Sequence, residues 1–479
     1  MENNLIPLLP AAEVLLTALT VLVMDLYLRE EEKGILAWIG FLGLAIAGGM
    51  SLFLWGGREA LFGEALRVEN FSLFFMLLFL AAAAITILLS VSYIKEAAIR
   101  AGEFYALILF SVFGMILMAA AEDLILFFLG LETMSIAVYI LTGMWRERSE
   151  ASEAAMKYFL VGAFAAGFLL YGIALIYGAT GSTNLVRVAA ILSQPKDQWP
   201  LLLLAGVFLL FVGLAFKAAA APFHFWVPDV YEGAPTPIAG FMSVAVKAAA
   251  FAAWARIFLH RLSPLQGDWT LPLKVLAILT MTVGNLLAIS QSSVKRMLAY
   301  SSIAHAGYLL IALVVGGEMG GQALLFYLLS YAAMALGAFG VLGSLKEGAK
   351  DNEAYRDLAG LGFKRPFLGA AMALFMLSLA GFPPLGGFTG KFYLFRAAIV
   401  AGHLDLAIIG AINSLLSVVF YLKVIVAMYM EEGGAEGKPF NRAPYLYLAV
   451  AACAIATLYL GIFPSAALDL SLKSFASLR

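Results

Sequence analysis

The sequence predicts an all-α polytopic membrane protein with about 14 transmembrane helices. Of its 479 residues, 63% are hydrophobic and 13% are charged, and the mean hydropathy is +0.94. A soluble domain carries about 25% charged residues, so this chain has about half the charge that a water-facing surface requires. Apolar stretches long enough to cross about 30 Å of hydrocarbon recur along the sequence. The bilayer is therefore the expected solvent.

Short charged or glycine-rich turns separate these apolar stretches, and no segment between them resembles a soluble domain. The stretches lie at residues 5–28, 34–55, 71–93, 104–121, 123–144, 155–178, 200–222, 237–259, 271–291, 296–315, 321–344, 366–400, 404–430 and 444–464. Each is expected to form one membrane helix. Prolines interrupt two of them, at Pro222 and at Pro383–Pro384.

A weak internal repeat appears at an offset of 169 residues, where 135–139 (SIAVY) parallels 304–308 (AHAGY). The two proline-interrupted stretches fall in register within a few residues. An odd number of helices in each copy reverses its orientation, so two inverted five-helix repeats, each with a broken helix, are predicted, as in transporters. Chance similarity between apolar helices is the alternative. The expected parts are N-terminal helices 1–3 (1–100), a first repeat with helices 4–8 (101–262), a second repeat with helices 9–13 (263–432) and a C-terminal helix 14 (433–479).

Basic residues outside the helix centres divide unevenly between the two sides of the membrane. Sixteen fall on one side: Arg29, Lys33, Lys95, Arg100, Arg146, Arg148, Lys157, Lys295, Arg296, Lys346, Lys350, Arg356, Lys364, Arg365, Lys438 and Arg442. Eight fall on the other: Arg58, Arg67, Arg187, Lys196, Arg261, Lys274, Lys473 and Arg479. This bias predicts that the first side is cytoplasmic in a bacterial inner membrane, with both termini on the outer side.

The composition also argues against several classes of function. Cys453 is the single cysteine, which excludes internal disulfides, cysteine-rich zinc sites and iron–sulfur clusters. The four histidines are scattered, and no phosphate-binding or dinucleotide-binding glycine motif is present. A net charge of −1 argues against a general nucleic-acid partner. We therefore expect neither a cofactor nor a metal in this chain.

Six basic residues remain within the apolar stretches: Lys217, Lys247, Arg256, Lys391, Arg396 and Lys423. A lysine at the centre of a membrane helix costs about 2.5–3.5 kcal/mol on insertion scales, so it persists when it is paired, hydrated or useful. An acidic residue, Glu132, lies about nine residues into its own stretch. Ser135 and Tyr139 follow at i+3 and i+7, which places three polar groups on one helical face.

This pattern of buried charges predicts proton exchange. Burial disfavours the charged form of a lysine, and a nearby carboxylate favours it, so a Glu–Lys pair of changing separation can bind and release a proton. Glu132 and Lys217 are the expected pair. Lys247, near the middle of its stretch, and Lys391, after the irregular segment GFPPLGGFTG, are expected to continue the pathway. Mutual structural pairing of these charges is the alternative.

Other polar residues are weaker candidates. His305 shares a face with Ser301 and Tyr308 and is a candidate relay between the two halves, although a structurally satisfied histidine is the alternative. Lys423 is a candidate for an exit path.

Two interpretations stay open for Lys157 and Arg256, which either join the pathway or extend to an interface. Asp229 and Glu232 are expected in a loop that caps a helix or seals a cavity, and His224 shares that loop.

Four motifs then resemble one protein family. Residues 217–238 read KAAAAPFHFWVPDVYEGAPTPI, which is similar to the signature segment of the antiporter-like membrane subunits of respiratory complex I, in the form typical of subunit N. GLETMS at 130–135, VKRMLAYSSIAHAGY at 294–308 and GFPPLGGFTGKF at 381–392 also match that family. The resemblance covers essentially the whole chain.

The resemblance implies a proton-translocating subunit of an NADH:quinone oxidoreductase with two half-channels. Glu132 and Lys217 would be the modulating pair, Lys247 the connecting lysine, His305 a polar link and Lys391 the terminal lysine. Flavin, iron–sulfur clusters and quinone reduction would belong to other subunits. The chain itself would have no catalytic chemistry, and neighbouring antiporter-like and small membrane subunits would be its partners. A subunit of a multi-protein cation/proton antiporter or membrane-bound hydrogenase is the alternative, and a structural scaffold is a third.

Overall fold

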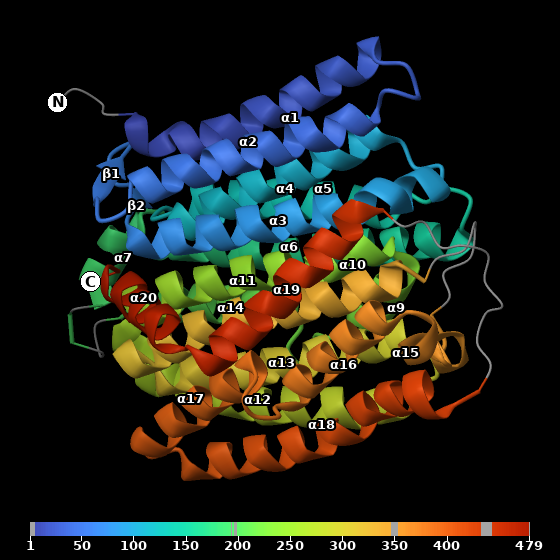
Figure 1. Ribbon diagram of the computed structural model, residues 1–479. Helices are drawn as coiled ribbons and strands as arrows, with labels where there is room; N and C mark the ends of the chain where they lie inside the picture. Colours follow the sequence, from blue (N-terminus) through green and yellow to red (C-terminus); the bar gives the residue numbers. More distant parts are fainter. Residues whose placement is uncertain (1–4, 193, 196–198, 346–352, 433–442, 479) are drawn as a thin grey trace.

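The protein is a bundle of helices that lie side by side and run in roughly the same direction across the view, from α1 at the top to α18 at the bottom (Figure 1). The computed structural model describes residues 5–192, 194–195, 199–345, 353–432 and 443–478. The helices of the first part are η1 (Ile6–Leu8), α1 (Leu9–Tyr27), α2 (Gly34–Phe53), α3 (Asn70–Glu96), α4 (Ala101–Ala120), α5 (Leu124–Thr142), α6 (Ser149–Thr180) and α7 (Leu185–Leu192).

The middle of the chain contributes short and long helices. They are α8 (Leu201–Lys217), α9 (Val227–Gly233), α10 (Thr236–Phe241), η3 (Met242–Val246), α11 (Lys247–Trp254), η4 (Ala255–Arg261), η5 (Ser263–Leu265) and α12 (Gln266–Ile289). The last part contains α13 (Val294–Val315), α14 (Gly317–Gly343), η6 (Tyr355–Leu358), α15 (Leu361–Lys364), α16 (Pro366–Ala380), α17 (Gly386–Val400), α18 (Leu404–Met430), α19 (Pro444–Ile462) and α20 (Ser465–Ala476).

The membrane prediction is confirmed. Within the described residues, 12 helices are long and apolar enough to span a bilayer. The other two expected stretches, both interrupted by proline, form the shorter helix α8 and the separate helices α16 and α17. Gly381, with φ of +93°, ends α16, because glycine adopts the left-handed conformation without a Cβ clash. Pro383 and Pro384 follow and prevent a regular helix.

The chain is also irregular after α8, where Ala219 has a positive φ of 59° and Pro222 lacks a donor. The freed backbone is satisfied by a neighbouring helix, because the Ala221 amide donates to Thr280 Oγ1 of α12 at 2.9 Å. Irregular backbone at membrane depth is tolerated where protein surrounds it in this way.

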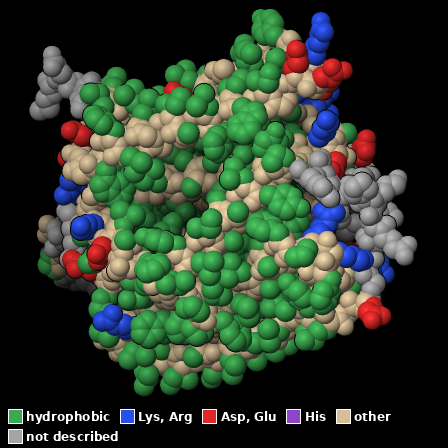
Figure 2. Space-filling view, viewed as in Figure 1, with side chains coloured by type: hydrophobic (Ala, Val, Ile, Leu, Met, Phe, Trp, Pro, Cys, Tyr) green, Lys and Arg blue, Asp and Glu red, His purple; other side chains and the backbone are tan. Residues whose placement is uncertain are grey.

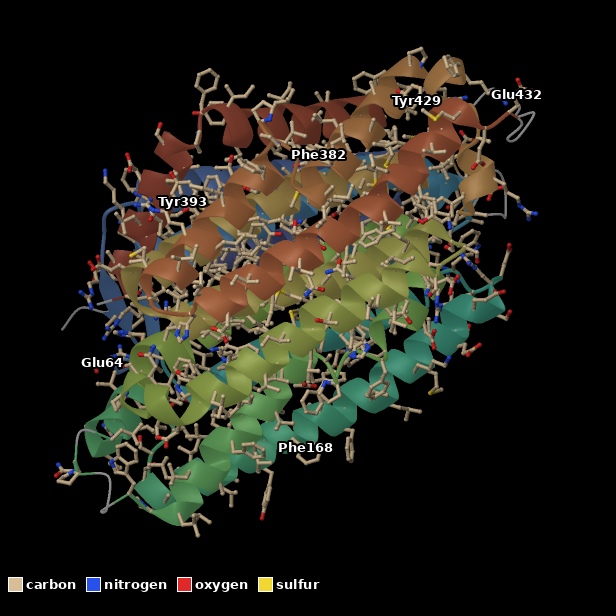
Figure 3. All side chains as sticks on the ribbon, turned by 90° about the horizontal axis from the view of Figure 1, so that it is seen from below. Glu64, Phe168, Phe382, Tyr393, Tyr429 and Glu432 are labelled. Atoms are coloured by element: carbon tan, nitrogen blue, oxygen red, sulfur yellow. The ribbon has the colours of Figure 1, made fainter. Side chains whose placement is uncertain are left out.

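The surface has an apolar band between two charged ends (Figure 2). The amino-terminal end of the described chain, α7 and α20 lie at one end, together with the antiparallel hairpin β1 (Glu59–Leu61) and β2 (Leu66–Val68) (Figure 1). Glu64 of that hairpin and Glu432 after α18 lie at opposite ends (Figure 3). Of the basic residues assigned to loops, Lys196, Lys346, Lys350, Lys438, Arg442 and Arg479 lie outside the described residues.

Several short elements were not predicted from the sequence, among them the hairpin, the short helix α7 and the terminal helix α20. The expected last membrane helix, over 444–464, corresponds to α19, and α20 follows it. Leu66 of the hairpin bridges to Ala121 in the turn between α4 and α5, and so ties the first helices to the rest of the bundle.

The helical segment from Thr236 to Arg261 lies at the centre, and every residue of its apolar window is buried. It is not a uniform α-helix, because η3 and η4 are π-helical and flank α11. Single π-helical turns are rare and often mark functional positions. Lys247 follows η3 directly, and Arg256 lies within η4.

Candidate functional site

Lys217, the last residue of α8, points towards α5. Its Nζ donates to Ser135 Oγ at 2.7 Å and to the Tyr139 hydroxyl at 3.3 Å, and only 2% of the residue is exposed. Nζ also lies 5.4 Å from the centroid of the Tyr139 ring. Neutral oxygens and an aromatic face therefore solvate this ammonium group.

Glu132 shares the same face of α5 but does not form an ion pair with Lys217. Its carboxylate lies within electrostatic range of Lys217, while Oε1 is buried and has no hydrogen-bond partner. A buried carboxylate oxygen without a hydrogen-bond donor is costly in free energy, so binding of a proton or the approach of a cation would stabilise this site. The pair is thus held apart in this structure.

Lys247 is 2% exposed and lies in the central helical segment. Its Nζ donates to both the backbone carbonyl and the hydroxyl of Ser302 on α13. The ammonium also faces the ring of Tyr331, with Nζ 5.6 Å from the ring centroid. As with Lys217, its partners are neutral.

His305 forms a relay of hydroxyl groups between three helices. Nδ1 lies 2.6 Å from the Tyr327 hydroxyl of α14, and Nε2 lies 3.1 Å from the Tyr421 hydroxyl of α18. Tyr421 is also hydrogen-bonded to Ser301, one turn before the histidine. His305 lies within electrostatic range of both Lys247 and Lys391.

Lys391, on α17, reaches back to the end of α16. Its Nζ donates to the carbonyl oxygens of Leu379 at 2.9 Å and Ala380 at 3.1 Å, and to Ser414 Oγ at 2.9 Å. The last carbonyls of a helix have no intrahelical partner and carry a partial negative charge, so the break in the chain creates this binding site for an ammonium group. Nζ also lies 4.9 Å from the ring centroid of Tyr308.

Arg256 belongs to a different kind of site, in which every charge has an opposite charge beside it. It is 1% exposed, and its guanidinium contacts Glu69 and Glu122, the latter at 2.8 Å. Arg261 adds a second cation, 2.7 Å from Glu122. The interpretation that Arg256 extends to an interface is therefore wrong, because two buried carboxylates hold it inside the protein. We call these four residues the Arg256 cluster.

Glu122 lies between α4 and α5. Burial acts to raise the pKa of its carboxyl group, but the two guanidiniums outweigh this effect and hold the pKa below its ordinary value. Glu122 is therefore charged, and its oxygens fix the turn between α4 and α5 to the end of the central segment.

Asp229 and Glu232 lie in helix α9, so the prediction of a loop is wrong. Asp229 accepts from Lys157 and from Arg296, each at 2.8 Å, and Glu232 accepts from Arg296 at 2.6 Å. Burial raises the pKa of Asp229, but its two cationic partners outweigh this and lower it. Pro228, within the first turn, suits the start of the helix because its missing N–H would have no partner there.

Three other candidates lie nearer the surface. Lys157 is exposed on α6 and pairs with Glu153 at 2.7 Å as well as with Asp229. Lys423 is exposed on α18, and its Nζ lies 4.2 Å from the ring centroid of Tyr355. His224, in the turn after α8, is half-buried, and burial lowers its pKa. Among the described residues, the hydrogen bonds of Lys217, Lys247 and Lys391 do not involve these side chains.

Lys295 was counted among the charges outside the helices, and this assignment is wrong. It is fully buried in the first turn of α13, where Nζ lies 2.7 Å from Glu353 and also binds the carbonyl oxygen of Ala234 at 2.8 Å. It directly follows the polar segment QSSV (291–294), but this turn is covered by α9 and by the chain around Glu353.

Several site residues were not identified from the sequence: Ser302, Tyr327, Tyr331, Ser414 and Tyr421. Ser302 lies three residues before His305 and was detectable as part of the same polar face. The tyrosines come from α14 and α18, and nothing in their local sequence shows that they meet His305. Among the described residues, no group of three or more His, Cys, Asp or Glu side chains is placed to hold a metal ion.

Comparison with known proteins identifies the family of this chain. Residues 121–417 match the model of the family described as "NADH:quinone oxidoreductase/Mrp antiporter, TM". A relative from Trichlorobacter lovleyi, named NADH-quinone oxidoreductase subunit N, is 47% identical over 96% of this chain and 95% of its own. The chain belongs to this family, as a protein of the subunit N type.

Solved structures give the same family. A chain in the structure of respiratory complex I from Thermus thermophilus is 38% identical, covers 96% of this chain and 98% of that chain, and superimposes with a TM-score of 0.81. A chain of the Mrp complex from Dietzia is 23% identical, covers 98% and 97%, and has a TM-score of 0.85, which shows a shared fold. The antiporter-like membrane fold and the subunit N assignment are thus confirmed.

Proposed function

We propose that this chain carries protons across the membrane through Glu132, Lys217, Lys247, His305 and Lys391, within a subunit N-type component of an NADH:quinone oxidoreductase. One observation carries the proposal. Lys217, Lys247 and Lys391 are buried at membrane depth, and among the described residues their hydrogen-bond partners are hydroxyl groups and backbone carbonyls rather than carboxylates.

Neutral partners matter because they stabilise an ammonium group only moderately. A buried charge paired with a carboxylate stays ionised, whereas a buried lysine with neutral partners loses much of the free energy that keeps it protonated. A modest change in the distance to Glu132 can therefore shift the protonation of Lys217. Oε1 of Glu132, which has no hydrogen-bond partner, is the atom that would accept a hydrogen bond from Lys217 when the two side chains approach.

The relay around His305 supports proton transfer between the lysines. A neutral imidazole has one donor and one acceptor nitrogen, and here each nitrogen meets a tyrosine hydroxyl. Tyr331 packs against both His305, with ring centroids 4.9 Å apart, and the ammonium of Lys247. Tyr308 packs against His305 on one side and Lys391 on the other, with the His305 and Tyr308 centroids 5.7 Å apart.

The spacing of the helices supports two repeats over 101–262 and 263–432. The starts of α4, α5 and α6 lie 165, 170 and 168 residues before those of α12, α13 and α14. A break also follows α8 in the first part and α16 in the second, and a lysine lies beside each break. We propose that each repeat contributes one half-channel.

The remaining chemistry would belong to other subunits. We propose that flavin, iron–sulfur clusters and quinone reduction lie outside this chain, that its neighbours are other membrane subunits of the complex, and that it performs no redox step of its own. The end with α9 and Arg296 would face the bacterial cytoplasm, since more basic residues lie there. Relatives at 42–47% identity are named subunit N, which favours this assembly over a separate cation/proton antiporter.

The test is to replace Lys247 with Ala in the assembled complex and to measure protons translocated per NADH oxidised in membrane vesicles. We expect a loss of at least about tenfold, since removing a positioned proton-transfer group costs about 10²–10⁴ in rate. Lys473→Ala is the matched control, because this lysine is exposed on α20 and is not a candidate for the pathway, so pumping should be unchanged. Normal pumping per electron in an assembled Lys247→Ala complex would contradict the proposal.

A further inference from the structure

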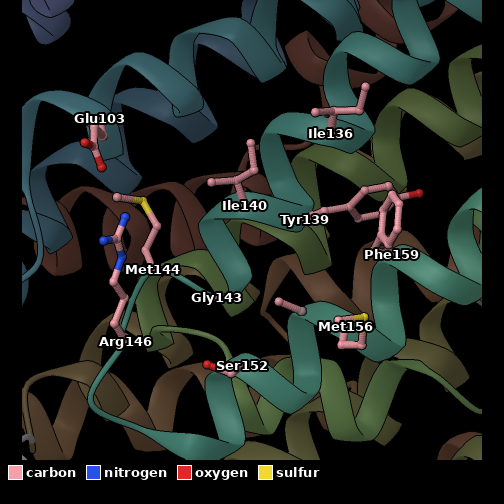
Figure 4. Close-up of a pocket in the computed structure, with 11 residues that line it drawn as sticks. Glu103, Ile136, Tyr139, Ile140, Gly143, Met144, Arg146, Ser152, Met156 and Phe159 are labelled. Atoms are coloured by element: carbon pink, nitrogen blue, oxygen red, sulfur yellow. The ribbon is translucent and has the colours of Figure 1, made fainter.

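A groove between α5 and α6 lies beside the proposed proton pathway, with Tyr139 in its wall. It has a volume of about 520 Å³ and lies between the end of α5 and the beginning of α6 (Figure 4). Its wall is largely apolar, formed by Ile136, Ile140, Met156 and Phe159, and all four side chains are exposed on the membrane-facing surface. A recess of this size and lining suits a small ligand or part of a lipid.

The charged residues that line the groove lie at one end of it. Arg146 lies at its outer end, exposed, and within the described residues it has no ion-pair partner. Glu103 also lines this end, but its charge is compensated by Arg100 at 3.1 Å. An uncompensated guanidinium above an apolar recess matches an anionic headgroup with a hydrocarbon tail, because guanidinium binds phosphate oxygens in a bidentate manner.

The extent of the groove distinguishes a lipid from a partner helix. Ile136 lies six residues before the end of α5 at Thr142, which is about 9 Å along the helix axis at 1.5 Å per residue. On α6 the lining ends at Phe159, within the first third of a helix that continues to Thr180. The recess therefore occupies one leaflet, as a phospholipid does, whereas a partner helix would contact both leaflets.

We propose that this groove binds an anionic phospholipid of the bilayer, with one acyl chain against Ile140 and Phe159 and the phosphate at Arg146. Tyr139 forms part of the same wall, and its hydroxyl accepts a hydrogen bond from Lys217. If the proposed function holds, the lipid also restricts the tyrosine that solvates Lys217, so pumping depends on the anionic lipid content.

The test uses the assembled complex in nanodiscs and a phosphatidylglycerol probe that carries a photoreactive diazirine in its acyl chain. After illumination, peptides with bound probe are mapped by mass spectrometry. We expect labelling of residues 136–159, at least fivefold weaker in Arg146→Gln and in Ile140→Trp, which fills the groove. Leu129→Trp, an exposed position on α5 outside the groove, should label like the wild type. A diazirine phosphatidylcholine probe should label several-fold less.

Equal labelling in all variants would show bulk lipid contact and overturn the proposal. So would crosslinking of a photoreactive residue at position 140 to another subunit, which would show that a protein partner fills the groove. The substituted side chains are exposed, so folding should be retained, and labelling needs no turnover. A failure of the lipid site is therefore distinguishable from a failure of the proton pathway.

Discussion

Two groups of buried charges in this protein differ in their partners. The Arg256 cluster (Glu69, Glu122, Arg256 and Arg261) places two carboxylates against two guanidiniums, so its charges compensate one another. Lys217, Lys247 and Lys391, in contrast, are solvated by hydroxyl groups, carbonyls and aromatic rings. Arginine is always protonated in proteins, whereas lysine changes protonation readily when buried. The first group therefore suits a permanent structural role, and the second suits proton exchange.

The positions of the two groups agree with this division. The cluster joins the N-terminus of α3, the turn between α4 and α5 and the π-helical end of the central segment, three regions distant in sequence. The lysines lie beside helix breaks or next to the other π-helical turn, where the backbone itself supplies acceptors.

The largest expected effect comes from Arg256→Ala. This change removes one of the two guanidiniums that neutralise the buried carboxylates of Glu69 and Glu122. Breaking a buried ion pair costs about 3–5 kcal/mol. We expect little assembled complex, measured by native gel electrophoresis of solubilised membranes. Lys217→Ala should assemble normally, because it removes a charge without leaving a paired carboxylate. Similar assembly of both variants would remove the distinction between the two groups.

A charge-conserving exchange sharpens the comparison. Lys247→Arg keeps the positive charge, but the guanidinium does not deprotonate, so we expect pumping per NADH to fall about tenfold or more while assembly is retained. Arg256→Lys should show the reverse, with normal pumping in whatever complex assembles. Its thermal stability should fall, because an ammonium group lacks the planar fork that bonds Ala119, Glu122 and Glu69 at once. Full pumping by Lys247→Arg would indicate that its charge, rather than its proton, is required.

A smaller effect is expected from Tyr421→Phe, which removes the hydroxyl between His305 Nε2 and Ser301. Pumping should fall several-fold, because the hydroxyl belongs to the proposed proton relay. The melting temperature should be unchanged, because the aromatic ring and its packing are retained. Tyr429→Phe, on the same helix but packed against Phe363, is the control and should pump normally. An identical reduction in both variants would point to a general effect on α18.

The smallest effect concerns Asp229, whose pKa is lowered by Lys157 and Arg296. The ionised carboxylate therefore adds to the free energy of unfolding at pH values above its ordinary pKa of 3.8. This contribution is lost as the pH falls through the lower pKa of the folded state. Because Asp229 is partly exposed, Asp229→Asn should lower the melting temperature by at most about 2 °C at neutral pH. The difference from wild type should disappear below that pH window. A difference in melting temperature that persists in acid would show that the charge of Asp229 is not its cause.

Much of the site was predictable because its residues are unusual where they stand. Lys247 and Lys391 are charged in apolar surroundings, and Pro222, Pro383 and Pro384 mark the breaks beside the site. The errors have one origin. Arg256, Lys295 and Asp229 were judged from local composition, but their burial and partners depend on segments far away in the chain, such as Glu69 and Glu353.

The sequence by itself determined that this is a membrane protein, where its helices fall and which charges are costly, because hydropathy and helix-breaking residues act locally. Tertiary structure decided which buried charges are neutralised and which are not. Lys217 and Arg256 look alike in the sequence, each a cation in an apolar helix. Only packing reveals that one meets a serine and a tyrosine, and the other meets two glutamates. Coulomb interactions decay with distance in space, and the sequence does not state that distance.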